Sequence, residues 1–239
     1  MEILEFLKNN RGIILLLDPD KLELEDLAGL EKRIKNSPVQ LIFVGGSEVA
    51  PGKTDQIVTA LKNQISLPII LFPGSHEQIS DRADAILFLS LISGRNPEYL
   101  IDQHVKSVPK LRSIDLEIIP TSYLLIDGGN RPSTSRVTQT NGMPQEHEQK
   151  IVDTAVAGQW QGKKLTYLEA GSGAIFPVKP TIISKVKKEI NHPIIVGGGI
   201  KTAQNIQDAL NAGAQFVVIG NAFENNPNLF EEISYAGLN

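Results

Sequence analysis

The sequence predicts an α/β fold of the TIM (β/α)8 barrel type, because short apolar runs alternate with segments of helical spacing along the chain. Its 239 residues suit one barrel of ordinary size. Most of the apolar runs are hydrophobic at nearly every position, which is typical of parallel strands buried on both faces. We therefore expect residues 1–239 to form a single barrel domain. An open, doubly wound sheet is the alternative.

Eight candidate strands follow one another at regular distances. In chain order they are Gly12–Leu17, Gln40–Val44, Pro68–Phe72, Ala85–Leu89, Leu116–Ile126 (which Pro120 would interrupt), Leu165–Glu169, Pro193–Val196 and Gln215–Ile219. Helical stripes lie between them at Leu24, Leu27, Leu30 and Ile34, at Ile57, Leu61 and Ile65, at Ile182, Val186 and Ile190, and at Ile206 and Leu210. Thr202 can cap the last of these helices and Gly213 can end it. Right-handed crossovers between such units would make the strands parallel.

One segment departs from this rhythm. Residues 127–145 read DGGNRPSTSRVTQTNGMPQ and are rich in Gly, Pro, Ser, Thr and Asn. The segment is longer than a routine connection, so we expect a long mobile loop over one face of the barrel. A linker between domains is the alternative, but the three candidate strands that follow are too few for a second domain.

Composition excludes several classes of protein. The chain has 23 basic and 27 acidic residues, a net charge of −4 and only 5% aromatic residues, so no nucleic-acid partner is expected. It has no cysteine, which excludes disulfides, thiolate metal ligands and a cysteine nucleophile. The run Ile13–Leu17 is too short to span a bilayer, and residues 1–10 lack the layout of a signal peptide. We expect a cytoplasmic protein without stable membrane insertion.

Polar residues at the strand ends are the first candidates for a site, because barrel active sites lie at the carboxyl ends of the strands. Asp18 directly follows the first strand, and Ser47 follows two glycines after the second. Mg²⁺ prefers oxygen ligands, commonly one or two carboxylates together with substrate phosphates. Asp18 and Ser47 are therefore candidate metal ligands, although a simple turn at Asp18-Pro19 fits the sequence equally well.

The sixth strand carries a second candidate pair. Tyr167 and Glu169 are two residues apart and share one face of the strand, while Leu168 and Ala170 occupy the other. A carboxylate at the mouth of a barrel is costly unless it has a partner or a function. This pattern favours a functional role for Tyr167 and Glu169.

Glycine-rich strand ends predict a phosphate site. Many barrels bind phosphate at the loops after the seventh and eighth strands, where backbone N–H groups and helix starts attract anions. The candidate phosphate-binding residues are Gly171, Ser172, Gly198, Gly199, Gly220 and Asn221. Taken alone, the Gly197-Gly198-Gly199 run could also be a tight turn.

Together these motifs resemble those of the geranylgeranylglyceryl phosphate synthases and the related bacterial heptaprenylglyceryl phosphate synthases. The resemblance rests on LDPDK (17–21), FVGGS (43–47), ILFPG (70–74), PTSYLLIDGG (120–129), YLEAGSGA (167–174), VGGGIKT (196–202) and IGNAFE (219–224). It implies a TIM barrel that joins sn-glycerol 1-phosphate to a long-chain prenyl diphosphate through an ether bond, with Mg²⁺, and releases diphosphate. Geranylgeranyl diphosphate is the favoured donor and a heptaprenyl donor the alternative.

The resemblance also implies roles for the candidate residues. Asp18 and Ser47 would hold Mg²⁺, Tyr167 and Glu169 would be the catalytic residues that bind the glycerol end, and Glu169 would be the general base. The phosphate would be bound by Gly171, Ser172, Gly198, Gly199, Gly220 and Asn221. Phe72, Tyr99 and Tyr123 would contribute to the wall of a prenyl groove. A homo-oligomer, at least a dimer, is expected.

One position departs from the pattern of some family members, which carry a phosphate-contacting lysine where this chain has Leu16. Lys21, Lys201 or Arg131 could then meet the phosphate charge. Two other functions remain open, namely another phosphate-binding barrel enzyme and a non-catalytic binder of phosphorylated metabolites. The first usually relies on a strand-end lysine or paired carboxylates, and no candidate strand ends in such a lysine. The second needs only the glycine-rich loops and would not require Asp18, Tyr167 and Glu169.

Overall fold

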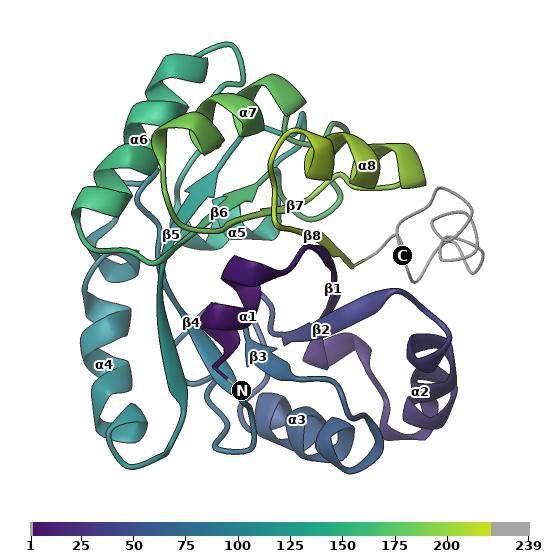
Figure 1. Cartoon of the computed structure of the whole chain (residues 1–239). Helices are drawn as coiled ribbons and strands as arrows, with labels where there is room; N and C mark the ends of the chain where they lie inside the picture. The colour runs from purple at the N-terminus through teal and green to yellow at the C-terminus, as the bar shows by residue number, and fades with distance from the viewer. Residues whose placement is uncertain (1, 221–239) are drawn as a thin grey trace.

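The structure, a computed structural model, describes residues 2–220. Eight parallel strands pair in chain order, and β8 pairs with β1 to close the barrel (Figure 1). The strands are β1 Gly12–Leu17, β2 Val39–Val44, β3 Ile69–Leu71, β4 Ala85–Ser90, β5 Glu117–Leu125, β6 Leu165–Glu169, β7 Ile194–Gly197 and β8 Phe216–Ile219. The predicted TIM barrel is confirmed, and the open sheet is excluded.

The expected break at Pro120 does not occur. Pro120 lies inside β5, opposite Phe88 of β4, and its carbonyl accepts a hydrogen bond from the Lys164 N–H at 2.8 Å. Proline removes only its own donor from the ladder, and here the neighbouring hydrogen bonds carry the strand through.

Helices pack around the outside of the barrel (Figure 1). They are α2 Leu27–Lys35, α3 Lys53–Gln64, α4 Asp102–Leu111, α6 Glu148–Trp160, α7 Pro180–Glu189 and α8 Ala203–Asn211, with short 3-10 turns at Pro19–Lys21, Leu24–Asp26 and Pro97–Tyr99. The short helix α5 (Ser133–Thr138) lies instead at the carboxyl ends of the strands, where its residues line the cavities described below. The predicted stripes face the barrel, except that Leu24 precedes α2 and is 42% exposed. Thr202 accepts the Asn205 N–H at 3.2 Å and Gly213 has φ +112°, so both predicted helix ends of α8 are confirmed.

An additional helix, α1 (Ile3–Asn9), closes the amino end of the barrel. Ile3 and Leu7 are buried with the side chains of the barrel interior, and Phe6 packs against Phe216 at the start of β8. The Glu117 carboxylate accepts the N–H groups of Ile3 and Leu4 at 2.5 and 2.9 Å. With this end filled, the space for a ligand lies at the opposite end, where the strands terminate.

The connection from β3 to β4 differs from the expected strand–helix pattern. Residues 72–84, all of which the structure describes, contain no helix, although the regular pattern predicts one there. Pro73-Gly74-Ser75 turns the chain, and a Cβ at Gly74 would lie only 2.4 Å from the Gly46 carbonyl oxygen. The segment is therefore held against the β2 loop.

The long connection at 127–145 links β5 to α6, but it is not the structureless loop that we expected. It contains α5, and Met143 forms a parallel bridge with Ile126. Ser135, Thr138, Thr140, Met143 and Gln145 are buried. A linker between domains is also excluded, because β6, β7 and β8 complete the same barrel. Among residues 2–220, no helix combines the length and hydrophobicity that crossing a bilayer requires.

Candidate active site

The carboxyl ends of the strands surround a polar cavity of about 1220 Å³, its open mouth included. Nearly all of the predicted site residues line it: Asp18, Ser47, Tyr167, Glu169, Gly171, Ser172, Gly198, Gly199 and Gly220. Asn221 lies outside the described residues. The ends of five strands (β1, β2, β6, β7 and β8) thus bring the candidate metal, catalytic and phosphate-binding residues into one space.

Glu169 ends β6 and is buried at the base of this cavity, with 6% of its surface exposed. Its Oε1 accepts the Gly171 N–H at 2.6 Å. Burial raises the pKa of Glu169 to about 7, against the opposing effects of the Gly171 N–H and the Tyr167 hydroxyl. The carboxyl group can therefore exchange a proton near neutral pH, as a general base must.

The Tyr167 hydroxyl is fully buried and has no hydrogen-bond partner of good geometry within the part of the chain that the structure describes. Burial first, and then the charge of Glu169, raise the pKa of Tyr167 well above its usual value, so the phenol stays protonated. A Cβ at Gly197 would lie 2.1 Å from this hydroxyl. An unsatisfied buried hydroxyl is costly, and at the edge of a cavity it points to a polar ligand.

Three glycines form the floor of the cavity beside Glu169. Gly171, Gly198 and Gly199 have φ values of +100°, +79° and +70°, which favour glycine. A Cβ at Gly198 would lie 2.5 Å from both Glu169 Oε1 and the Gly171 nitrogen. Gly220 differs, since the atom nearest to its added Cβ would be the Leu16 carbonyl oxygen at 3.6 Å. The first three glycines leave only backbone at this surface, which suits the close approach of an anion.

The candidate metal ligands follow the neighbouring strands β1 and β2. Asp18 Oδ1 accepts the Asp20 N–H at 3.2 Å, and its Oδ2 lies 3.9 Å from the Lys21 ammonium. A Cβ at Gly46 would lie 3.1 Å from Asp18 Oδ1, so this carboxylate is next to the loop that carries Ser47. Within residues 2–220, no three His, Cys, Asp or Glu side chains cluster as a metal centre. One carboxylate and one hydroxyl fit Mg²⁺ that is completed by water and ligand phosphates.

Two lysines also line the polar cavity, Lys21 and Lys201, whereas Arg131 does not. Leu16 lies in the same wall. Two of the three candidate cations are therefore placed where they can balance phosphate charge.

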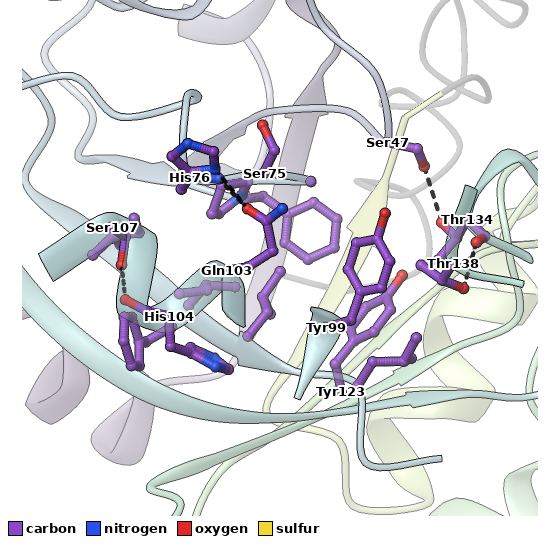
Figure 2. A pocket seen from close by; sticks show the side chains of 18 of the residues that line it. Ser47, Ser75, His76, Tyr99, Gln103, His104, Ser107, Tyr123, Thr134 and Thr138 are labelled. Atoms are coloured by element: carbon purple, nitrogen blue, oxygen red, sulfur yellow. Dashed lines mark hydrogen bonds between the residues drawn. The ribbon is translucent and has the colours of Figure 1, made fainter. Parts of the chain in front are cut away.

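A second, mainly apolar cavity of about 810 Å³ adjoins the first (Figure 2). The predicted groove residues Phe72, Tyr99 and Tyr123 line it, together with Ile79, Ile86, Leu87, Phe88, Leu89, Leu91 and Val137. Ser47 and Thr134 lie at one end of the view in Figure 2, and His104 and Ser107 at the other. The groove lies where the β3–β4 connection lacks a helix.

Both cavities share part of their wall. Gly46, Ser47, Phe72, Tyr123 and Thr134 line each of them. Phe72 stacks on Tyr167 with ring centroids 5.1 Å apart and meets Tyr123 edge-on at 5.9 Å. A polar ligand and an apolar chain could thus meet at this junction.

One residue that supports the site carries no signal in the sequence. Gln78 is buried in the helix-free β3–β4 connection, accepts the Gly74 N–H at 3.1 Å and donates to the Gly46 carbonyl at 3.0 Å. His76 lies in the groove wall, where its ring Nδ1 is 3.0 Å from Gln103 Oε1. These contacts join segments that only the folded barrel brings together.

Comparison with known proteins indicates the family of this chain. Residues 5–237 match the model of the PcrB family. The chain is 50% identical over 217 residues to the geranylgeranylglyceryl phosphate synthase of Zunongwangia profunda, covering 91% of this chain and 92% of the relative. It is 40% identical over 222 residues to the protein of the same name from Pyrococcus furiosus, covering 92% and 87%.

Solved structures agree. The Thermoplasma acidophilum (S)-3-O-geranylgeranylglyceryl phosphate synthase, in complex with its substrate sn-glycerol-1-phosphate, superposes with a TM-score of 0.90 at 33% identity and covers 98% of this chain and 96% of its own. The corresponding synthase of Thermoplasma volcanium has a TM-score of 0.90 at 34% identity, covering 100% and 97%. A thiamine phosphate pyrophosphorylase of Pyrococcus furiosus, with a TM-score of 0.58 at 13% identity, shares the fold alone.

Proposed function

The chain belongs to the PcrB family, and from this premise we propose that it transfers a prenyl group from a long-chain prenyl diphosphate to sn-glycerol 1-phosphate. An ether bond forms and diphosphate leaves. The observation that carries this proposal is the shared wall between a glycine-lined polar cavity and an apolar groove. This arrangement lets a phosphorylated acceptor and an apolar donor bind side by side.

The acceptor binds in the polar cavity. Backbone N–H groups of the loops at Gly171, Ser172, Gly198, Gly199, Gly220 and Asn221 bind its phosphate. Tyr167 donates its hydroxyl proton to a glycerol oxygen, and Glu169 accepts the proton of the attacking hydroxyl. The bound sn-glycerol-1-phosphate of the Thermoplasma acidophilum relative supports this choice of acceptor.

The donor places its diphosphate beside Asp18 and Ser47 and its tail in the apolar groove. Asp18 and Ser47 would hold Mg²⁺, which supplies Lewis-acid stabilisation of the departing diphosphate. Lys21 lies in the same wall and adds a further positive charge.

In the transfer step, one bond breaks and one bond forms at the allylic carbon of the donor. The bond between the allylic carbon and the diphosphate oxygen breaks, and its electron pair leaves with the diphosphate. The glycerol oxygen forms the new bond to that carbon, and its proton passes to Glu169. Fixed positions for both reactants supply much of the rate, because the attack becomes effectively unimolecular.

For the donor we propose geranylgeranyl diphosphate, which is supported by the names of the relatives, with heptaprenyl diphosphate as the alternative. We also propose a homo-oligomer, because Ile101, Val105 and Val108 form an exposed apolar face of α4 and Trp160 is 83% exposed. The cytoplasmic location stays a prediction from the sequence.

A transfer assay tests this function. The chain is incubated with radiolabelled sn-glycerol 1-phosphate, geranylgeranyl or heptaprenyl diphosphate, and Mg²⁺, and then extracted with organic solvent. We expect label in the organic phase, most with the geranylgeranyl donor, and little with sn-glycerol 3-phosphate or without metal. Label that stays in water with every donor would leave another phosphate-binding enzyme or a non-catalytic binder as the function.

A further inference from the structure

The short helix α5 (Ser133–Thr138) forms the partition between the two cavities. Ser133 lines the polar cavity, Val137 and Thr138 line the apolar groove, and Thr134 lines both. Thr134 is therefore a side chain that both reactants would pass. No motif in the sequence marks it, because α5 lies in the polar 127–145 connection.

Contacts at both ends fix α5 against the barrel. Thr134 Oγ1 lies 3.0 Å from Ser47 Oγ, and this pair is drawn in Figure 2. Arg136 forms an ion pair with Glu48, the residue after Ser47. Asn96 Nδ2 donates to the Thr138 carbonyl at 3.0 Å. The partition is thus tied to the loop that carries the proposed metal ligand.

The Thr134 hydroxyl also meets the aromatic wall. Burial raises the pKa of Tyr123, and hydrogen bonding between the Tyr123 and Thr134 hydroxyls opposes that rise. Ser47, Thr134 and Tyr123 therefore form a row of hydroxyl groups along the junction of the cavities. A hydroxyl group offers one proton and two lone pairs, so Thr134 can accept hydrogen bonds from Ser47 and from the protonated Tyr123 hydroxyl and still donate its own proton to a ligand.

We propose that Thr134 is a further substrate-binding residue, whose hydroxyl donates a hydrogen bond to the diphosphate of the prenyl donor at the junction of the two cavities. The proposal rests on the proposed function. A Ser47 hydroxyl oxygen that binds a cation is a poor hydrogen-bond acceptor. Ser47 therefore acts as the donor in its hydrogen bond with Thr134. The Thr134 proton then points to the anion, and the bond holds the allylic carbon beside the acceptor.

Two variants separate this role from packing. Thr134→Val keeps the branched shape and removes the hydroxyl, whereas Thr134→Ser keeps the hydroxyl. Inorganic diphosphate with Mg²⁺ is the probe, titrated calorimetrically into the whole chain, and sn-glycerol 1-phosphate is titrated in parallel. A hydrogen bond to a charged group predicts roughly tenfold to hundredfold weaker diphosphate binding for Thr134→Val. Thr134→Ser should bind within about threefold of the native chain, and glycerol phosphate affinity should not change in either variant.

Thr140→Val is the matched control. Thr140 is a buried threonine of the same connection, its hydroxyl donates to the Thr138 carbonyl at 3.3 Å, and it is outside both cavity linings. Its variant should bind diphosphate like the native chain. The inference is overturned if Thr134→Val binds diphosphate normally, or if it weakens both ligands equally and Thr134→Ser does not restore them.

The transfer assay keeps this test distinct from the proposed function. A native chain that transfers the prenyl group, combined with normal diphosphate binding by Thr134→Val, overturns the role of Thr134 alone. A native chain that neither transfers label nor binds diphosphate overturns both.

Discussion

Glu169 and Gly171 are joined by a hydrogen bond of 2.6 Å from the Gly171 N–H to the Glu169 carboxylate. The proposed base and the proposed phosphate loop are therefore one structural unit. Gly198, from the next strand end, packs against both groups so closely that a Cβ would lie 2.5 Å from each. Changes at any of these three positions should affect proton transfer and phosphate binding together.

The first prediction concerns the pH dependence of turnover. Because burial raises the pKa of Glu169 to about 7, the carboxyl group is mostly protonated below pH 7 and mostly ionised above it. We expect kcat/KM to rise with pH through about 7 and then level off. Glu169→Gln should lose roughly 10²- to 10⁴-fold in rate together with this rise. A native profile that is flat from pH 5 to 8, or a Gln variant of near-native rate, would remove Glu169 as the base.

The second prediction concerns stability. The folded-state pKa of Glu169 is about 7 and its ordinary value is 4.5, so between these values the unfolded chain binds fewer protons than the folded chain. This carboxyl group therefore lowers the free energy of unfolding as pH rises from 4.5 to 7. Above pH 7 the free energy of unfolding is lower by about 3 kcal/mol than it is below pH 4.5.

Urea unfolding at pH 4.5 and pH 8 checks this prediction. We compare the free energy of unfolding of Glu169→Gln with that of the native chain at each pH. The difference should favour the variant more at pH 8 than at pH 4.5. An equal difference at both pH values would show that the carboxyl group is not held in a desolvated site.

The third prediction compares two glycines of the proposed phosphate site. Gly198 has φ +79° and no room for a Cβ, so Gly198→Ala should cost roughly 1 to 3 kcal/mol and weaken sn-glycerol 1-phosphate binding. At Gly220, the atom nearest to an added Cβ would be 3.6 Å away, which is an ordinary contact distance. The free energy of unfolding of Gly220→Ala should therefore lie within about 0.5 kcal/mol of the native value. Thermal unfolding measures the contrast, and equal losses at the two positions would contradict it.

The fourth prediction concerns the closed end of the barrel. Glu117 accepts two N–H groups at the start of α1, so Glu117→Ala should cost roughly 0.5 to 2 kcal/mol and speed hydrogen exchange in residues 3–9. Turnover should not change, because this end lies opposite the active site. Glu5→Ala, an exposed change in the same helix, is the control. Unaltered exchange in the Glu117 variant would mean that the carboxylate does not hold α1.

The fifth prediction concerns donor length. Ser107 on α4 is small and buried, and it lies at the end of the groove away from Ser47 (Figure 2). Ser107→Phe should fill that end, so that activity falls more steeply for heptaprenyl than for geranylgeranyl diphosphate. Ser113→Phe, just beyond α4 and exposed, should leave the preference unchanged. Equal losses with both donors would place the tail elsewhere.

The strands and most of the site could be predicted from the sequence, because β1 and β6 are buried on both faces and their ends carry polar residues or glycine. The helix-free β3–β4 connection could not, since it depends on the contact of Gly74 with Gly46. Nor could α5, whose residues STSRVT lack an apolar stripe. Thr134 and Ser47 are 87 positions apart and meet only in the closed barrel.

A crystal structure with sn-glycerol 1-phosphate, Mg²⁺ and an unreactive thiolo analogue of geranylgeranyl diphosphate tests the two-cavity account most directly. We predict the glycerol phosphate on Gly171 and Gly198, its hydroxyl within hydrogen-bond distance of Glu169, and the prenyl tail along Phe72 and Tyr123. Phosphate bound away from these glycines, or a tail lying outside the groove, would contradict the account.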